Sequence, residues 1–135
     1  ECDSTAALFT SSDKAADEVF IICNDEEDRR KIKAEFESFD NVQFCLLADR
    51  FLEITKKGTD KGAALKKICE HLKIDTAQTI AFGDGENDLQ FLEVAGTAVA
   101  MANAVDSVKQ KADIVTKSNN ENGVCTVLND LLSRI

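Results

Sequence analysis

Two carboxylates and one amide follow a short apolar run in the middle of the chain. Residues 79–82 lack helical spacing and predict a strand, and Asp84, Asn87 and Asp88 come soon after it. In open α/β sheets, ligands bind at the carboxyl ends of the strands. Carboxylates crowded there repel one another, so a hard cation such as Mg2+ would stabilise them. Asp and Asn also favour helix starts, so an acidic turn that caps the next helix is the alternative.

A lysine in the first turn of a predicted helix is the second candidate. Lys61 opens a segment whose apolar stripe runs from residue 63 to residue 72, and Thr59 or Asp60 is the predicted N-cap. A cation at this end of a helix opposes the macrodipole, which prefers anions. Lys61 is therefore either an ordinary solvated lysine or a cation beside a helix N-terminus that binds phosphate. Taken alone, the pattern favours the solvated lysine.

Together, these stretches resemble the haloacid dehalogenase-like hydrolase superfamily, and within it the Cof-type phosphatases. The resemblance rests on Lys-Gly-Thr-Asp-Lys-Gly at 57–62, Gly-Asp-Gly-Glu-Asn-Asp at 83–88 and Ala-Val-Ala-Met-Ala-Asn-Ala at 98–104. It runs from about Phe51 to the C-terminus and includes Lys-Gln-Lys-Ala-Asp at 109–113. The ordered combination is more specific than any one of these segments.

The resemblance implies a Mg2+-dependent phosphatase that acts on a small phosphorylated metabolite through an aspartyl-phosphate intermediate. Asp84 matches the metal-binding carboxylate of the family, and Asp88 matches the carboxylate that supports it at the metal. Asn87 and Lys61 match the residues that contact the phosphoryl group. Lys61, Asp84 and Asp88 would then be the catalytic residues that this chain carries. A phosphomutase of the same superfamily is an alternative that these motifs leave open.

The chain departs from the family by lacking its first motif. That motif, Asp-x-Asp-Gly-Thr after the first core strand, supplies the nucleophile and the acid/base, and it occurs nowhere in the 135 residues. Asp25 also follows an apolar run, but Glu27 stands two residues later and no Gly-Thr follows. Asn24 and the acidic run after it are therefore interpreted as an N-cap and a first helical turn.

We therefore expect the chain to hold half of an active site and to be inactive alone. Without the strand that bears the nucleophile, the strand at 79–82 would present an unpaired apolar edge. The expected partner is therefore the missing N-terminal part of the same protein or a second chain. The run 19–23 folding back onto that edge is the structural alternative. A regulatory module that has lost the nucleophile but keeps a phosphate pocket is the competing function.

The elements that must position these residues predict an α/β fold in two parts. Residues 1–55 resemble part of the α/β cap domain of Cof-type enzymes, and residues 56–135 resemble the C-terminal half of the hydrolase core, a Rossmann-like parallel sheet. The cap part is predicted to contain a buried strand at 19–23, a helix carrying Ile32, Phe36 and Phe39, and strands at 42–47 and 51–55. The core part is predicted to add strands at 97–101 and 113–115 and helices at 107–111 and 124–132, with Gly96 as a helix C-cap.

Composition excludes several functional classes. The net charge of -9 argues against partners such as nucleic acid or an anionic membrane, which need a basic footprint. No apolar segment approaches membrane-spanning length and no signal peptide is visible, so we expect a cytoplasmic protein. The five cysteines have no Cys-x-x-Cys spacing and mostly lie in apolar runs, which favours free thiols in a reducing compartment. The single histidine, His71, is expected at the surface rather than in a zinc site.

Overall fold

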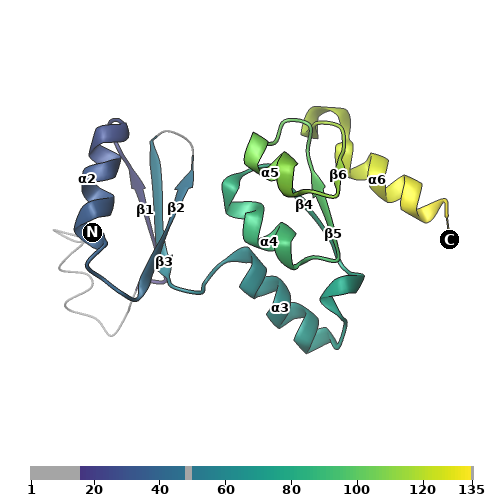
Figure 1. The fold of residues 1–135 in the computed structure, drawn as a ribbon, viewed down its shortest axis with the longest axis horizontal. Helices are drawn as coiled ribbons and strands as arrows, with labels where there is room; N and C mark the ends of the chain where they lie inside the picture. Colours follow the sequence, from purple (N-terminus) through teal and green to yellow (C-terminus); the bar gives the residue numbers. More distant parts are fainter. Residues whose placement is uncertain (1–15, 48–49, 135) are drawn as a thin grey trace, which may run out of the picture. The chain divides into compact units, whose positions relative to one another are not determined.

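The computed structural model describes residues 16–47 and 50–134, and the chain divides into two compact units, Glu1–Lys57 and Gly58–Ile135 (Figure 1). In the described residues, the first unit combines one helix with a small sheet, and the second combines several helices with another. None of the helices in the described ranges is both long enough and apolar enough to cross a membrane.

The first unit is an antiparallel three-stranded sheet with a helix packed on one face. The strand order is β1-β3-β2. Ile32 and Phe36 of the helix pack against Leu52 and Ile54 of the central strand, which forms a small core. The elements are β1 (Glu18–Ile22), α2 (Glu26–Phe36), β2 (Val42–Leu47) and β3 (Phe51–Lys56).

The acidic turn before α2 is a helix cap, as predicted, although the capping residue is Asp25 and not Asn24. The Asp25 carboxylate accepts a hydrogen bond from the backbone N–H of Asp28 at 2.9 Å, while Asn24 donates its side-chain amide to the Asp28 carboxylate at 2.7 Å. Phe39 was expected in this helix, and that prediction is wrong. The helix ends at Phe36, and Phe39 is 55% exposed in the following turn.

The strand predicted at 19–23 is present as β1, but it is not buried. Phe20 is 50% exposed and Ile22 is 65% exposed. Both alternate with Ile21, which faces the core under α2, so they lie on the sheet face that this helix does not cover. β1 pairs with β3, placing Ile21 opposite Leu52, so it belongs to the antiparallel sheet of the first unit.

The second unit contains a parallel sheet in the order β4-β5-β6, which confirms the predicted α/β class. Phe82 of β4 lies opposite Val99 of β5, and Val99 lies opposite Ile114 of β6. Parallel neighbours require crossover connections, and short helices supply them here. The elements are α3 (Lys61–Leu72), η1 (Thr76–Gln78), β4 (Ile80–Gly83), η2 (Glu86–Asp88), α4 (Leu89–Val94), β5 (Thr97–Ala100), α5 (Asp106–Lys111), β6 (Ile114–Val115), η3 (Asn119–Glu121) and α6 (Gly123–Leu132).

One face of this sheet is made of alanines. Ala81 of β4 and Ala98 and Ala100 of β5 pack against Leu92 of α4 and Val108 of α5, and all five side chains are buried. Small side chains on the strands let the two helices approach the sheet closely, and close packing gives the sheet little freedom to shift. The strand ends from which the loops at the carboxyl edge start are therefore held in place by this packing.

Gly96 was predicted to be the C-cap of the helix that follows the strand at 79–82, and the structure corrects this. The last residue of α4 is Val94, and Ala95 caps it with an extended backbone. Among the glycines of the described chain, Gly58 is the one with a positive φ. At Gly96 a Cβ atom would lie 2.0 Å from the carbonyl oxygen of Ala77, so glycine is required by a close backbone approach and not by a turn.

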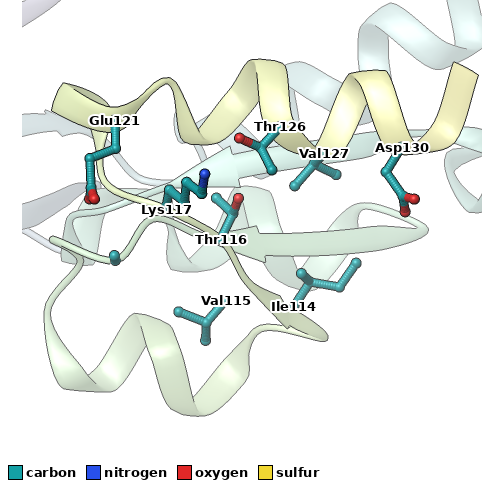
Figure 2. Close-up of a pocket in the computed structure, with 9 residues that line it drawn as sticks. Ile114, Val115, Thr116, Lys117, Glu121, Thr126, Val127 and Asp130 are labelled. Atoms are coloured by element: carbon teal, nitrogen blue, oxygen red, sulfur yellow. The ribbon is translucent and has the colours of Figure 1, made fainter.

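The second unit also has surfaces that its own described elements do not cover. In the described chain, β4 pairs with β5 alone, so its other edge has no strand beside it. A wide groove of about 590 Å³ runs between β6 and α6, and Ile114 and Val127 are among its lining residues (Figure 2). Leu128 and Leu132 of α6 are 39% and 68% exposed. Exposed apolar surface of this kind is typical of a face that packs against another segment.

The cysteines and the histidine largely match expectation. Cys23 and Cys69 are buried free thiols, Cys45 is partly buried, and Cys125 is exposed on α6. Cys2 lies outside the described residues. His71 is exposed near the end of α3.

Candidate functional site at the carboxyl end of β4

The chain turns sharply after β4, and this turn brings Asp88 back onto the strand end. Gly83 closes the strand, and a Cβ atom there would lie 2.7 Å from the Cβ of Asp88. The turn is also held from the neighbouring loop, because the N–H of Met101 donates to the Gly83 carbonyl and the N–H of Val105 donates to the Asp84 carbonyl, both at 3.0 Å. Asp84 and Asp88 thus lie together at the carboxyl edge of the sheet, as the sequence predicted.

Asp88 is buried, with only 6% of its surface exposed, and both carboxylate oxygens have partners. Oδ2 accepts hydrogen bonds from the backbone N–H of Asp84 at 3.0 Å and of Gly85 at 3.2 Å. Oδ1 pairs with the ammonium of Lys61. Burial by itself raises the pKa of this carboxyl, but the hydrogen bonds from Lys61 and the two amides, with the charge of Lys61, hold the pKa below its usual range.

Lys61 is the first residue of α3, and two local features place it there. Asp60 caps the helix by accepting a hydrogen bond from the N–H of Ala63 at 2.7 Å. Gly62 packs directly on α4, because a Cβ atom at this position would lie 2.4 Å from the carbonyl oxygen of Gln90. The Lys61 side chain is half exposed, yet its ammonium lies on Asp88, 27 residues away in sequence. The structure therefore decides against an unpaired, fully solvated lysine.

Asp84 differs from Asp88 because its side chain is exposed at the rim of the site. Its Oδ2 accepts a hydrogen bond from the side-chain amide of Asn103 at 2.9 Å. The Oδ1 of Asn103 in turn accepts from the backbone N–H of Asn119 at 3.0 Å. Sequence reasoning gave Asn103 no role, although it lies in the segment 98–104 that follows a core strand. Its place after the carboxyl end of β5 was the available signal.

Asn87 lies in η2, directly before Asp88, and is partly buried. Its Oδ1 lies so close to Gly85 that a Cβ atom at that position would be 2.7 Å from it. The structure therefore brings all four predicted site residues to one end of the second unit.

The carboxylates differ in what they can offer a cation. The described residues contain no group of three or more His, Cys, Asp or Glu side chains that could hold a metal ion. Asp88 already uses both oxygens, whereas Asp84 presents an exposed carboxylate with hard oxygen donors, which suits Mg2+. A cation bound here would take Asp84 as one ligand and would need further oxygens from water, a substrate or another segment.

The sequence of the chain is similar to the sequences of known proteins. The model of a haloacid dehalogenase-like hydrolase family matches residues 2–128. The protein YkrA of Bacillus subtilis is 40% identical over 114 residues, covering 84% of this chain and 42% of that protein. A phosphoglycolate phosphatase of Methanopyrus kandleri is 45% identical over 82 residues, covering 61% of this chain and 35% of that protein.

Solved structures agree with the sequence comparison. A haloacid dehalogenase-like hydrolase from Bacillus subtilis has a TM-score of 0.81 at 31% identity, and the similarity covers 91% of this chain and 44% of that chain. The chain therefore spans less than half the length of these relatives.

Proposed function

Because the chain belongs to the haloacid dehalogenase-like hydrolase family, we propose that it is half of a Mg2+-dependent phosphomonoesterase for a small phosphorylated metabolite. The observation that carries the proposal is the Lys61 ammonium held on the buried Asp88 beside the exposed Asp84. This arrangement presents a fixed cation and an exposed carboxylate at the strand end where α/β proteins bind ligands. The name of the Methanopyrus kandleri relative, a phosphoglycolate phosphatase, supports a small phosphate ester as the substrate class.

In this proposal each residue has a separate task. Asp88 fixes Lys61, whose ammonium stabilises the charge that develops on the phosphoryl oxygens. Asn87 donates its amide to the same phosphoryl group. Mg2+ bound at Asp84 would neutralise the phosphate charge, which matters because the chain itself carries a net charge of -9. The attacking aspartate is supplied by a segment outside this chain.

The open edge of β4 is the proposed place for that segment. In the described chain β4 has a strand partner on one side only. An unpaired strand edge readily pairs with another chain. We expect the segment to come from the rest of the same protein or from a second chain. Sedimentation of the purified chain tests this, and a compact monomer that hydrolyses phosphate esters with Mg2+ unaided would contradict it.

The function itself is tested in the full-length protein with p-nitrophenyl phosphate. Lys61→Ala should lower turnover by roughly a hundredfold or more, because the lost cation acts mainly on transition-state charge. Lys66→Ala is the matched control, since it removes the same charge from an exposed position on α3. Near-normal turnover of Lys61→Ala would refute the role of Lys61.

The metal is tested separately by calorimetric titration with Mg2+. Asp84→Ala should abolish binding, while Glu86→Ala, which removes an exposed carboxylate two residues away, should leave binding intact. Undiminished Mg2+ binding by Asp84→Ala would refute the assignment of Asp84 as a metal ligand. If the full-length protein binds Mg2+ and phosphate but hydrolyses no ester, the regulatory-module alternative is correct instead.

A further inference from the structure

Three loops at the carboxyl edge of the parallel sheet meet at one side chain. Asp84 follows β4, Asn103 follows β5 and Asn119 follows β6. The Asn103 side chain joins all three, because its Nδ2 donates to the Asp84 carboxylate at 2.9 Å while its Oδ1 accepts from the N–H of Asn119 at 3.0 Å. The three residues are far apart in sequence, and parallel pairing of the strands is what aligns them.

The backbone that carries Asn103 is fastened on both sides. Met101 donates its N–H to Gly83 and Val105 donates its N–H to Asp84, each at 3.0 Å. Between them, Ala104 is buried, and its N–H donates to the Met101 carbonyl at 2.9 Å. The backbone at Asn103 is therefore fixed by the sheet and the turn, and its side chain starts from a defined position.

The chemistry of the amide also decides which of its atoms faces Asp84. The backbone N–H of Asn119 can only donate, so it must meet the Oδ1 of Asn103. The NH2 group of Asn103 must then face the Asp84 carboxylate. An ionised carboxylate can only accept, so the NH2 group donates to it. Asn119 thus locks Asn103 in the orientation that donates to Asp84.

We propose that Asn103 is a positioning residue that holds Oδ2 of Asp84 and so directs Oδ1 toward the cation. This inference rests on the proposed metal role of Asp84. Hydrogen bonds from a second residue to a ligating carboxylate orient the ligand, and their loss typically weakens metal affinity by about tenfold or more. The start of η3 also becomes part of the site, because the backbone N–H of Asn119 donates to the side-chain amide of Asn103. The Asn119 side chain has no role in this proposal.

Calorimetric titration of the full-length protein with Mg2+ tests the proposal. Asn103→Ala, and Asn103→Leu as a variant of nearly unchanged volume, should each raise the Mg2+ dissociation constant roughly tenfold. The Mg2+ concentration that half-saturates phosphatase turnover should rise by the same factor. Saturating Mg2+ should restore most of the turnover, which a purely structural loss would not permit. The exposed position of Asn103 lets both variants fold, and a melting curve checks this.

Ser118→Ala is the matched control. Ser118 donates its hydroxyl to Glu121 at 2.5 Å, so its loss removes a neighbouring hydrogen bond while the Asn119 N–H that holds Asn103 and the donor to Asp84 both remain. Its Mg2+ affinity should stay within about twofold of the unmodified protein, well inside the loss expected at Asn103. Unchanged affinity in both Asn103 variants, or an equal loss in Ser118→Ala, would overturn the proposal. Undiminished binding by Asp84→Ala would instead refute the metal role on which it rests.

Discussion

Replacing Asp88 by alanine is the most direct test of how the site is held together. The carboxylate accepts hydrogen bonds from the backbone N–H groups of Asp84 and Gly85 and pairs with Lys61, so alanine leaves three donors without their acceptor. A donor that loses its partner in a buried place costs about 1 to 3 kcal/mol. Both N–H groups lie at the rim of the site, so the lower end of that range applies to each.

The ion pair adds little to this figure. The Asp88 side chain is only 9% exposed, but the Lys61 side chain is 52% exposed, so water screens the pair from the lysine side and we take the value of a screened pair, about 0 to 1 kcal/mol. We therefore expect Asp88→Ala to lower the free energy of unfolding by roughly 2 to 3 kcal/mol. Asp88→Asn keeps one oxygen for the two backbone donors, but its NH2 group replaces the oxygen that accepts from Lys61. The half-exposed Lys61 ammonium can then turn to water, so the change should cost about 1 kcal/mol.

Urea unfolding of the full-length protein, followed by far-UV circular dichroism, measures these changes. Circular dichroism follows the helices of this chain, which itself supplies no tryptophan or tyrosine for fluorescence. Asp130→Ala is the control, since it removes an exposed aspartate that pairs with Arg134 at 2.5 Å on the surface of α6 and should cost less than about 0.5 kcal/mol. Asp88→Ala should lower the free energy of unfolding more than Asp130→Ala does, and an equal or smaller loss would contradict the reasoning. A loss in Asp88→Asn as large as that in Asp88→Ala would show that the backbone hydrogen bonds do not provide the stability.

Two further predictions concern the pH dependence of the Asp88 contacts and the close contact at Gly62. Because the folded-state pKa of Asp88 lies below its unfolded-state value, its contribution is present above the unfolded pKa and is lost as pH falls through the folded pKa. The free energy of unfolding, measured by urea titration, should therefore differ less between Asp88→Ala and the unmodified protein as the pH is lowered. A difference that stays constant with pH would contradict the pairing. Gly62→Ala should destabilise the protein by about 1 to 3 kcal/mol, because a Cβ atom would lie 2.4 Å from the Gln90 carbonyl oxygen. Helix propensity alone predicts the opposite sign, so a raised melting temperature would disprove the close approach of α3 and α4.

The local elements of this protein were accessible from its sequence. Apolar periodicity located the strand that became β4 and the helix that became α3, and Asp60 was one of the two N-caps expected. These features depend on neighbouring residues, which the sequence displays directly. The placement of Asp84 and Asp88 at a strand end followed from the same local pattern.

Tertiary structure alone decided how these residues interact. The pairing of Lys61 with Asp88 depends on α3 packing against α4, and the contact of Asn103 with Asp84 depends on the parallel register of β4 and β5. The exposure of Phe20 and the close approach at Gly96 had the same origin. In each case the deciding partner lies on another segment of the chain. Local spacing predicts which face a side chain takes on its own element, but only packing determines what meets that face.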